Sequence, residues 1–315
     1  MVLANTKTIL KKAQKGKYAV GHFNINNMEI VQAVVAAAEK MKSPVILATS
    51  EGAIKYAGIE YLYNLAVTAS GSVGKVKGKN IPIALHLDHG KDMKIIKQCI
   101  DIGYSSVMID ASHEDFETNI KLTKKVVQWA HKKGISVEAE IGTIGGTEDL
   151  VSSKHIIYTD PKKAKEFVDR TGCDFLAVAI GTSHGAYKFK IQGNKPVKLR
   201  QDILKEIKKI VKIPLVLHGA SGVPKNMVKI AKQYGADLSG VKGVPETQTK
   251  IAIKGGICKV NTDTDLRIAF DAGVRSVIKN KPKDFDPRHI LGPAKEMMQK
   301  VVEDRIKLFG SVNKA

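Results

Sequence analysis

Short apolar runs alternate with longer amphipathic segments along almost the whole chain. A short apolar run bounded by polar or glycine-containing stretches is typical of a buried strand, whereas apolar residues recurring every three or four positions predict a helix. The expected strands are residues 19–23, 44–48, 82–87, 105–109, 136–140, 175–179, 214–217 and 257–260.

The segments between these runs have helical periodicity. Thr159-Asp160 before Pro161 also provides a helix start signal, because a side-chain cap is followed by proline at the first helical position. The expected helices are residues 28–40, 58–69, 93–102, 116–132, 161–170, 200–211, 225–234 and 263–278.

Strands that are apolar on both faces and alternate with helices predict a parallel sheet covered by helices. An open doubly wound sheet has the same alternation, but eight regular units favour an α/β fold of the closed (β/α)₈ TIM barrel type. We therefore expect one barrel domain over residues 1–315. A C-terminal helical extension is expected from about residue 279, with its last helix near residues 294–308.

Two stretches interrupt this regularity. Residues 71–80 are rich in glycine and lysine, but no Ser or Thr follows Gly78-Lys79, so we interpret them as a basic surface turn and not as a phosphate loop. Residues 141–155 are too long and too rich in glycine for an ordinary connection, and they are a candidate lid.

The charge balance points to anionic partners. The chain has 315 residues, with 51 Lys and Arg against 31 Asp and Glu, and a formal net charge of +20. Phosphorylated metabolites and nucleic acids both fit that charge. The lysines are spread along amphipathic segments such as residues 202–210, and aromatic residues make up only 5%. This pattern favours solvated helix faces, so nucleic-acid binding is kept only as a remote alternative.

The N-terminal residues and the apolar runs bear on the cellular location of the protein, and the positions of the cysteines bear on whether disulfides form. The first residues lack the apolar core of a secretory signal, and no run approaches the ~20 apolar residues of a spanning helix, so we expect a cytoplasmic protein. Cys99, Cys173 and Cys258 are far apart and odd in number, which predicts small buried side chains rather than disulfides.

Polar residues stand at or just beyond the end of every expected strand. In a barrel of this kind the active site lies at the carboxyl ends of the strands, so these positions converge. They are Asn24, Ser50, Asp88 with His89, Asp110, Glu140, His184, His218 and Asn261.

Three of these strand ends carry a histidine followed by glycine. His89, His184 and His218 would meet near the barrel axis, and three imidazoles with open positions suit a catalytic divalent metal ion. His86 has the same strand-end setting, and the spacing alone leaves it as an alternative ligand. Asp88 is placed either to exchange a proton with a substrate oxygen or to orient a ligand.

Two segments after the seventh and eighth strands are suited to a phosphate group. Gly219-Ala220-Ser221-Gly222 and Asn261-Thr262-Asp263-Thr264 offer small and hydroxyl residues where such barrels often bind phosphate with backbone amides and a helix N-terminus. The sequence therefore predicts a metal ion beside a phosphate site.

These motifs together resemble the class II, metal-dependent fructose-bisphosphate aldolases over essentially the full length of the chain. The matching segments are Leu87-Asp88-His89-Gly90, Glu138-Ala139-Glu140-Ile141-Gly142, Gly181-Thr182-Ser183-His184-Gly185-Ala186-Tyr187-Lys188, Leu217-His218-Gly219-Ala220-Ser221-Gly222 and Val260-Asn261-Thr262-Asp263-Thr264-Asp265-Leu266-Arg267.

The resemblance implies a role for each matching residue. His89, His184 and His218 would hold the catalytic Zn²⁺, and Asp110 and Glu140 would hold a second, displaced metal position. Asp88 would exchange a proton with the C4 hydroxyl, and Glu148 would move protons at the dihydroxyacetone phosphate carbon. Thr147 stands before Glu148 where some members have a second glutamate. The implied substrate contacts are Asn24, Ser50, Gly185, Lys188, Gly219, Ala220, Ser221, Asn261, Thr262, Asp263, Thr264, Arg267 and Arg288.

The resemblance also implies the reaction and its partners. Fructose 1,6-bisphosphate would be cleaved reversibly to dihydroxyacetone phosphate and glyceraldehyde 3-phosphate, with Zn²⁺ stabilising the enediolate. Tagatose 1,6-bisphosphate is the alternative substrate. We expect a homodimer or homotetramer in which Arg288 or Arg267 reaches across the subunit interface, and a monovalent cation is an additional candidate cofactor.

Overall fold

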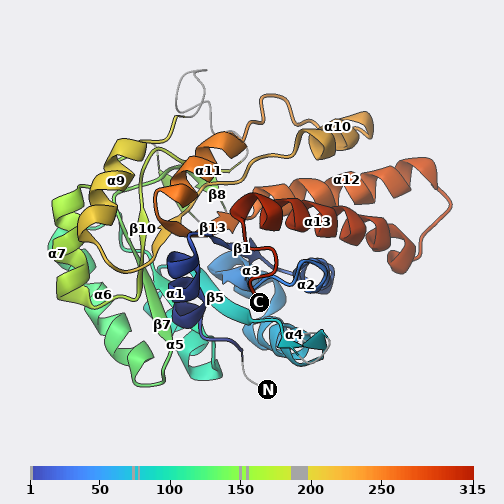
Figure 1. The fold of residues 1–315 in the computed structure, drawn as a ribbon. Helices are drawn as coiled ribbons and strands as arrows, with labels where there is room; N and C mark the ends of the chain where they lie inside the picture. Colours follow the sequence, from blue (N-terminus) through green and yellow to red (C-terminus); the bar gives the residue numbers. More distant parts are fainter. Residues whose placement is uncertain (1–2, 73–74, 77–78, 149–150, 154–155, 186–197) are drawn as a thin grey trace.

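The structure is a computed structural model that describes residues 3–72, 75–76, 79–148, 151–153, 156–185 and 198–315 (Figure 1). Eight parallel strands form a closed barrel in the order β1-β13-β12-β10-β7-β6-β5-β2, so strands that follow one another in sequence are neighbours. They are β1 (Val20–Asn24), β2 (Val45–Ser50), β5 (Ile83–Gly90), β6 (Ser106–Ile109), β7 (Ser136–Ile141), β10 (Phe175–Val178), β12 (Leu215–Leu217) and β13 (Ile257–Thr262). The predicted (β/α)₈ barrel and its eight strands are confirmed.

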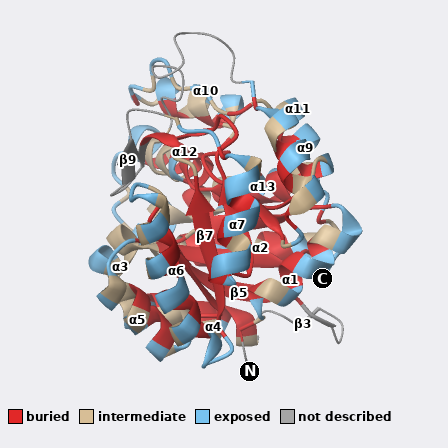
Figure 2. Cartoon of the chain, turned by 90° about the vertical axis from the view of Figure 1, so that its left-hand side faces the viewer, coloured by how far each residue is buried: buried red, intermediate tan, exposed pale blue. Residues whose placement is uncertain are grey.

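The expected helices are also present, and the strands lie buried inside the layer that the helices form (Figure 2). At the start of α7, Asp160 accepts from the Lys163 amide ahead of Pro161, as its sequence predicts. The helices that correspond to the expected ones are α2 (Met28–Met41), α4 (Ile59–Ser72), α5 (Met93–Ile102), α6 (Phe116–His131), α7 (Pro161–Thr171), α9 (Gln201–Ile210), α10 (Lys225–Gln233) and α12 (Thr264–Asn280).

In the part of the chain that the structure describes, three further helices were not predicted from the sequence: α1 (Thr6–Gly16), α3 (Glu51–Ala57) and α11 (Glu246–Lys254). Helix α1 closes the N-terminal end of the barrel, where Ile9 and Leu10 pack against interior side chains that include Val20 and Phe175. Only a few positions of α1 are apolar, so its sequence gives a weak helical pattern. The reason for those apolar positions becomes clear only once the end of the barrel that they cover is known.

The last helix begins earlier than expected. Helix α13 spans Pro287–Phe309 and contains Pro293, so the prediction that it starts after Pro293 is wrong. Asp286 caps its start by accepting from the Arg288 amide, and Pro287 occupies the first turn. Helix α13 packs against α12 and α2, and the far end of the α12–α13 pair projects away from the barrel (Figure 1).

The remaining strands are short. β8 (Gly145–Glu148), β9 (Val151–Ser153) and β11 (Ser183–His184) form a small sheet, and β3 (Lys75–Val76) pairs with β4 (Lys79–Asn80). The candidate lid at residues 141–155 therefore contributes two of these strands, and residues 149–150 and 154–155 lie outside the described residues.

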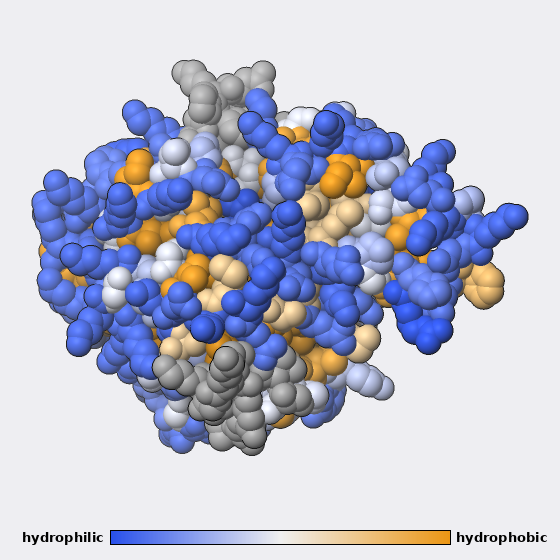
Figure 3. All heavy atoms as spheres, turned by 45° about the vertical axis from the view of Figure 1, so that its right-hand side comes forward, coloured by the Kyte–Doolittle hydropathy of each residue, from blue (hydrophilic) through white to orange (hydrophobic). Residues whose placement is uncertain are grey.

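The described surface and cysteines agree with the sequence pattern. The face in Figure 3 is mostly hydrophilic, with apolar patches between the polar side chains. Cys99, Cys173 and Cys258 are buried free thiols. Among the described helices, none is long and apolar enough to cross a membrane.

Candidate metal centre and active site

Three imidazole rings meet at the carboxyl end of the barrel. The ring centroid of His89, on β5, lies 4.8 Å from that of His184 on β11 and 4.5 Å from that of His218, which follows β12. Both neighbouring rings stand nearly edge-on to His89, at 75° and 89°. The structure thus brings together the three histidines that the sequence singled out.

A distortion of β5 allows two adjacent residues to face this site. Neighbouring side chains on a regular strand point to opposite faces, so Asp88 and His89 could not both point inward. The pairing of β5 with β6 shifts between Leu87 and Gly90, and His89 has a φ of 48°. This bulge, with its left-handed backbone, turns His89 toward the site while Asp88 keeps its interior position.

Carboxylates fix the orientation of two of the three histidines. His89 Nδ1 lies 2.7 Å from Asp110 Oδ2, and His218 Nε2 lies 2.6 Å from Glu138 Oε1. Since a carboxylate accepts, each of these nitrogens carries the hydrogen, and the opposite nitrogens, His89 Nε2 and His218 Nδ1, face each other at 2.7 Å. Two lone pairs that face each other so closely are satisfied either by a proton shared between the two nitrogens or by a metal ion beside them.

A buried carboxylate oxygen of Glu140 also favours a metal ion at this site. Glu140 Oε2 is buried without a hydrogen-bond partner in the described part of the chain, 4.0 Å from His89 Nδ1 and 3.9 Å from His218 Nδ1. A buried, unpartnered acceptor is costly unless a cation or proton satisfies it. Asp88, His89 and His218, and likewise His89, Asp110 and Glu140, place one ligand atom each within 4.8 Å of one another. The donor set therefore fits a divalent metal ion.

The charges around the site explain where its protons reside. Burial disfavours the charged form of His89, but Asp88, Asp110 and Glu140 outweigh it and raise the pKa of His89 to about 10. Burial, reinforced by His89, holds the pKa of His218 well below its ordinary value. Burial and the nearby Asp110 raise the pKa of Glu140 well above its ordinary value. The cluster therefore retains protons that a metal ion has to displace.

This displacement predicts that metal binding depends on pH. With a His89 pKa of about 10, the side chain is protonated at neutral pH, so raising the pH removes the competitor and the affinity for Zn²⁺ should rise by up to tenfold per unit between about pH 6 and 9. Chelator competition measures the affinity, and calorimetry in buffers of different ionisation enthalpy measures the proton released. A flat affinity with no proton release contradicts the prediction.

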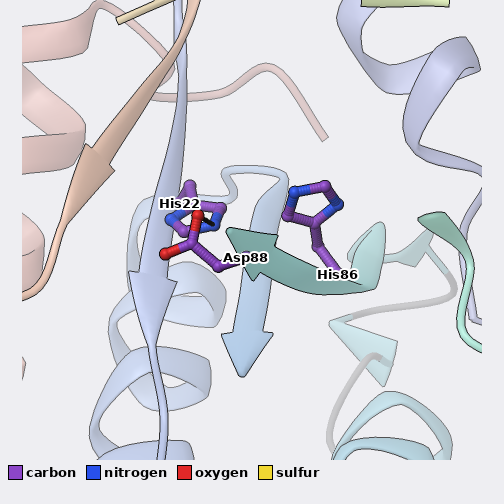
Figure 4. Close-up of side chains that lie close together, drawn as sticks. All are labelled: His22, His86 and Asp88. Atoms are coloured by element: carbon purple, nitrogen blue, oxygen red, sulfur yellow. Dashed lines mark ion pairs between the residues drawn. The ribbon is translucent and has the colours of Figure 1, made fainter. Parts of the chain in front are cut away.

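Asp88 is held by amide donors on both of its oxygens. Asn24 Nδ2 donates to Oδ2 at 2.9 Å, and Asn261 Nδ2 donates to Oδ1 at 3.0 Å. His22 Nε2 lies 3.6 Å from Oδ1, and Figure 4 shows the Asp88 carboxylate beside the His22 ring. Asp88 is buried, with 6% of the residue exposed, and its partners on β1 and β13 fix the position of its carboxylate.

His86, which the spacing left open as a ligand, lies deeper in the barrel. Its Nδ1 is 2.8 Å from Ser106 Oγ, and its ring centroid is 5.5 Å from that of His22 (Figure 4). His22, His86 and Asp88 also place ligand atoms within 4.8 Å of one another. Burial, aided by Lys259, holds the pKa of both imidazoles well below the ordinary value, so they are neutral side chains beneath the site.

Known proteins share this architecture and its sequence. Residues 4–314 match the family model described as "Fructose-bisphosphate aldolase class-II". The chain is 48% identical over 309 residues to the fructose-bisphosphate aldolase of Thermus caldophilus, covering 98% of each chain. It is 45% identical to that of Giardia intestinalis, covering 100% of this chain and 95% of the relative. The crystal structure of the YdjI aldolase from Escherichia coli K12 superposes with a TM-score of 0.77, at 34% identity and full coverage of both chains.

The chain belongs to the class II fructose-bisphosphate aldolase family. Aldolases of this family are metal-dependent lyases that act on a sugar bisphosphate, which agrees with the donor set described above.

The two segments expected at the substrate phosphate of this aldolase lie against each other. The Asp263 amide donates to Ser221 Oγ at 3.4 Å, and Arg267 binds the Asp263 carboxylate with a contact of 2.6 Å. Gly219 has a φ of 59°, and a Cβ built there would lie 2.6 Å from the Ser183 carbonyl oxygen. Ala220, Asn261, Thr262 and Thr264 are buried beside them, and Gly185 is half-buried.

Other expected substrate contacts lie elsewhere or outside the described residues. Ser50 caps α3 by accepting from the Ala53 amide at 3.1 Å. The Arg288 side chain is 86% exposed and pairs with Asp286 at the projecting end of the α12–α13 pair (Figure 1). Lys188 lies outside the described residues, and Glu148 ends β8 with its side chain outside them.

Gly146 leaves room for the backbone of His184. Gly146 pairs with His184 and has a φ of 98°, and a Cβ there would lie 2.5 Å from the His184 carbonyl oxygen. We therefore expect Gly146→Ala to displace His184 and to lower Zn²⁺ affinity by about 10–100-fold in chelator competition. Gly172→Ala is the matched control, because its φ is 71° but a Cβ would meet nothing within 4 Å. Equal affinities of the two variants contradict the expectation.

Three interior residues of the site were missed by the sequence reasoning: His22, Glu138 and Lys259. Each stands two positions before a polar strand-end residue, namely Asn24, Glu140 and Asn261. Because side chains alternate along a strand, a residue two positions earlier faces the same barrel interior. That spacing was the available signal.

Proposed function

We propose that this chain catalyses the reversible, metal-dependent cleavage of fructose 1,6-bisphosphate to dihydroxyacetone phosphate and glyceraldehyde 3-phosphate. The observation that carries the proposal is the facing pair His89 Nε2 and His218 Nδ1, 2.7 Å apart, with the buried Asp88 next to His89 in the chain. The names of the curated relatives support the same substrate.

In this proposal, His89, His184 and His218 hold Zn²⁺, because three imidazoles and an open position are typical of catalytic zinc. Asp110 and Glu140 provide the oxygens for a second, displaced metal position. The bound ion supplies a Lewis acid that stabilises negative charge developing on the ketose carbonyl oxygen. Asp110 and Glu138 keep the ligand nitrogens oriented by accepting from the other nitrogen of each ring.

Asp88 acts as the proton carrier. During cleavage the electron pair of the C3–C4 bond passes to the dihydroxyacetone phosphate half, where Glu148 supplies the proton that C3 takes up. C4 becomes the aldehyde carbon, and Asp88 takes the proton of the C4 hydroxyl. The proton returns to the oxygen during condensation. Asn24 and Asn261 donate to the two carboxylate oxygens, so Asp88 presents a fixed direction to the substrate.

The two phosphates need separate contacts. One phosphate is proposed to lie against residues 219–221 and 261–264, where Ser221 and Asp263 already meet. The other is proposed to use Ser50 and Arg288. Because Arg288 is exposed on the projecting end of the α12–α13 pair, we propose that it serves the site of a neighbouring copy in a homodimer or homotetramer. The substrate is a metabolite of the cytoplasm, where we place the enzyme.

The test of substrate identity is a comparison of two epimers. Purified, Zn²⁺-loaded protein should cleave fructose 1,6-bisphosphate with a kcat/KM at least about tenfold above that for tagatose 1,6-bisphosphate, equivalent to about 1.4 kcal/mol of transition-state discrimination. Both assays use the same coupling enzymes for the triose phosphates. A preference for tagatose 1,6-bisphosphate contradicts the substrate assignment while leaving the aldol chemistry intact.

A further inference from the structure

A buried lysine joins the two halves of the active site. Lys259, on β13, is fully buried, and its Nζ lies 2.9 Å from Glu138 Oε2 and 2.9 Å from Asn261 Oδ1. Glu138 Oε1 in turn accepts from His218 Nε2 at 2.6 Å, and Asn261 Nδ2 donates to Asp88 Oδ1 at 3.0 Å. One ammonium group therefore leads in two steps to a proposed metal ligand and in two steps to the proposed proton carrier.

The donors and acceptors along these connections allow one arrangement. A lysine ammonium only donates, so Asn261 must turn its oxygen toward Lys259 and its NH₂ toward Asp88. A carboxylate only accepts, so Glu138 Oε1 takes the hydrogen of His218 Nε2, while Glu138 Oε2 forms an ion pair with the Lys259 ammonium group. This leaves His218 Nδ1 as a bare acceptor facing His89. The Lys259–Glu138 ion pair and these hydrogen bonds together fix the donor and acceptor roles of Asn261 and His218.

Burial of this charge is difficult to explain by stability alone. Removing an ammonium group from water costs several kcal/mol even after relaxation, and apolar residues of similar volume are often as stable as a buried ion pair. Both side chains of the Lys259–Glu138 pair are completely buried. The pair is instead suited to orienting its neighbours.

We infer that Lys259 is a positioning residue that sets the His218 tautomer through Glu138 and the Asp88 direction through Asn261. The inference rests on the proposed function and adds Lys259 and Glu138, to which the resemblance assigned no role. Lys259 matters most for positioning while the enzyme is turning over. When Asp88 carries the C4 proton, its demand for an amide donor weakens, and Lys259 still holds the Asn261 amide in place for the return step.

Lys259→Met tests this role, because methionine keeps most of the volume and removes every donor. We expect a folded protein whose Zn²⁺ affinity falls by about 10–100-fold in chelator competition. We also expect kcat at saturating metal to fall by about tenfold or more, with KM within about threefold of wild type, because phosphate contacts are retained. The visible absorption spectrum of the Co²⁺-loaded variant should differ from that of the wild type, since the His218 orientation changes.

A matched control separates positioning from stability. Ser43→Ala removes a buried hydrogen bond near the start of β2, at the other end of the barrel, where Ser43 Oγ lies 2.9 Å from Ser311 Oγ. It should lower the melting temperature while leaving Zn²⁺ affinity, the Co²⁺ spectrum and kcat unchanged. If Lys259→Met does not fold, Lys259→Met/Glu138→Gln removes both charges, leaves no unpaired buried ion, and should show the same losses.

The outcomes distinguish this inference from the proposed function. A folded Lys259 variant with wild-type Zn²⁺ affinity, Co²⁺ spectrum and kcat, and only a lower melting temperature, overturns the positioning role. Wild-type protein that binds no Zn²⁺ or cleaves no sugar bisphosphate overturns the proposed function instead.

Discussion

Replacing Asp88 by asparagine is expected to lower kcat for fructose 1,6-bisphosphate cleavage by about 10²–10⁴-fold, the usual value of a positioned proton carrier. Asparagine has nearly the same shape but cannot take the C4 proton. Asn261 still donates to the remaining oxygen, and Asn24 can turn its amide so that its oxygen accepts from the new NH₂ group, so KM should change little. Steady-state kinetics on the Zn²⁺-loaded variant measure both quantities.

A half-reaction provides the control for this variant. Dihydroxyacetone phosphate has no C4 hydroxyl, so exchange of its C3 proton with solvent does not need Asp88. The Asp88→Asn protein should therefore bind Zn²⁺ with wild-type stoichiometry and retain deuterium exchange into dihydroxyacetone phosphate. A kcat within tenfold of wild type contradicts the role of Asp88, and loss of exchange together with cleavage indicates that the substitution damaged the site more widely.

The barrel could be predicted from the sequence because its strands are buried on both faces. Segments such as Val45–Ser50 and Phe175–Val178 appear as nearly continuous apolar runs, which few other structures produce. Helix α3 was missed because none of its residues is buried, so its pattern contains no apolar stripe. Local pattern therefore predicts elements that face the core and misses those that do not.

The predicted fold implied that the three histidines converge, but it did not predict their hydrogen-bond partners. Once the strand ends were assigned to one end of a barrel, His89 and His218 had to approach each other. Which ring nitrogen of His89 and of His218 faces the site depends on the hydrogen bonds to Asp110 and Glu138. Those hydrogen bonds depend on distances in the folded barrel, which the spacing of residues in the sequence does not give. The outward turn expected for His89 from strand alternation is reversed by the bulge in β5.

His22, His86, Glu138 and Lys259 form a polar layer beneath the site, and their positions follow a simple rule in the sequence. On β1, β5, β7 and β13, a polar residue two positions before the strand-end residue faces the same interior, as His86 does before Asp88. A buried Lys259 would ordinarily argue against a core strand. In this barrel it marks the interior side of a functional site, where local rules are most often broken.

Metal removal tests the central claim, because the three histidines and their carboxylate partners are arranged to hold a cation. Exhaustive chelation should abolish cleavage of fructose 1,6-bisphosphate, with a loss of at least about 10³-fold, corresponding to the several kcal/mol that a Lewis acid contributes. The fold should remain, since the barrel core is formed by apolar side chains away from the cluster.

The decisive measurement follows activity and bound metal together during chelation and reconstitution. The account predicts that activity disappears with the ion, returns in proportion to added Zn²⁺ up to the bound stoichiometry, and leaves no lysine adduct after borohydride treatment with dihydroxyacetone phosphate. Full activity in metal-free protein, or a borohydride-trapped lysine adduct, would contradict it.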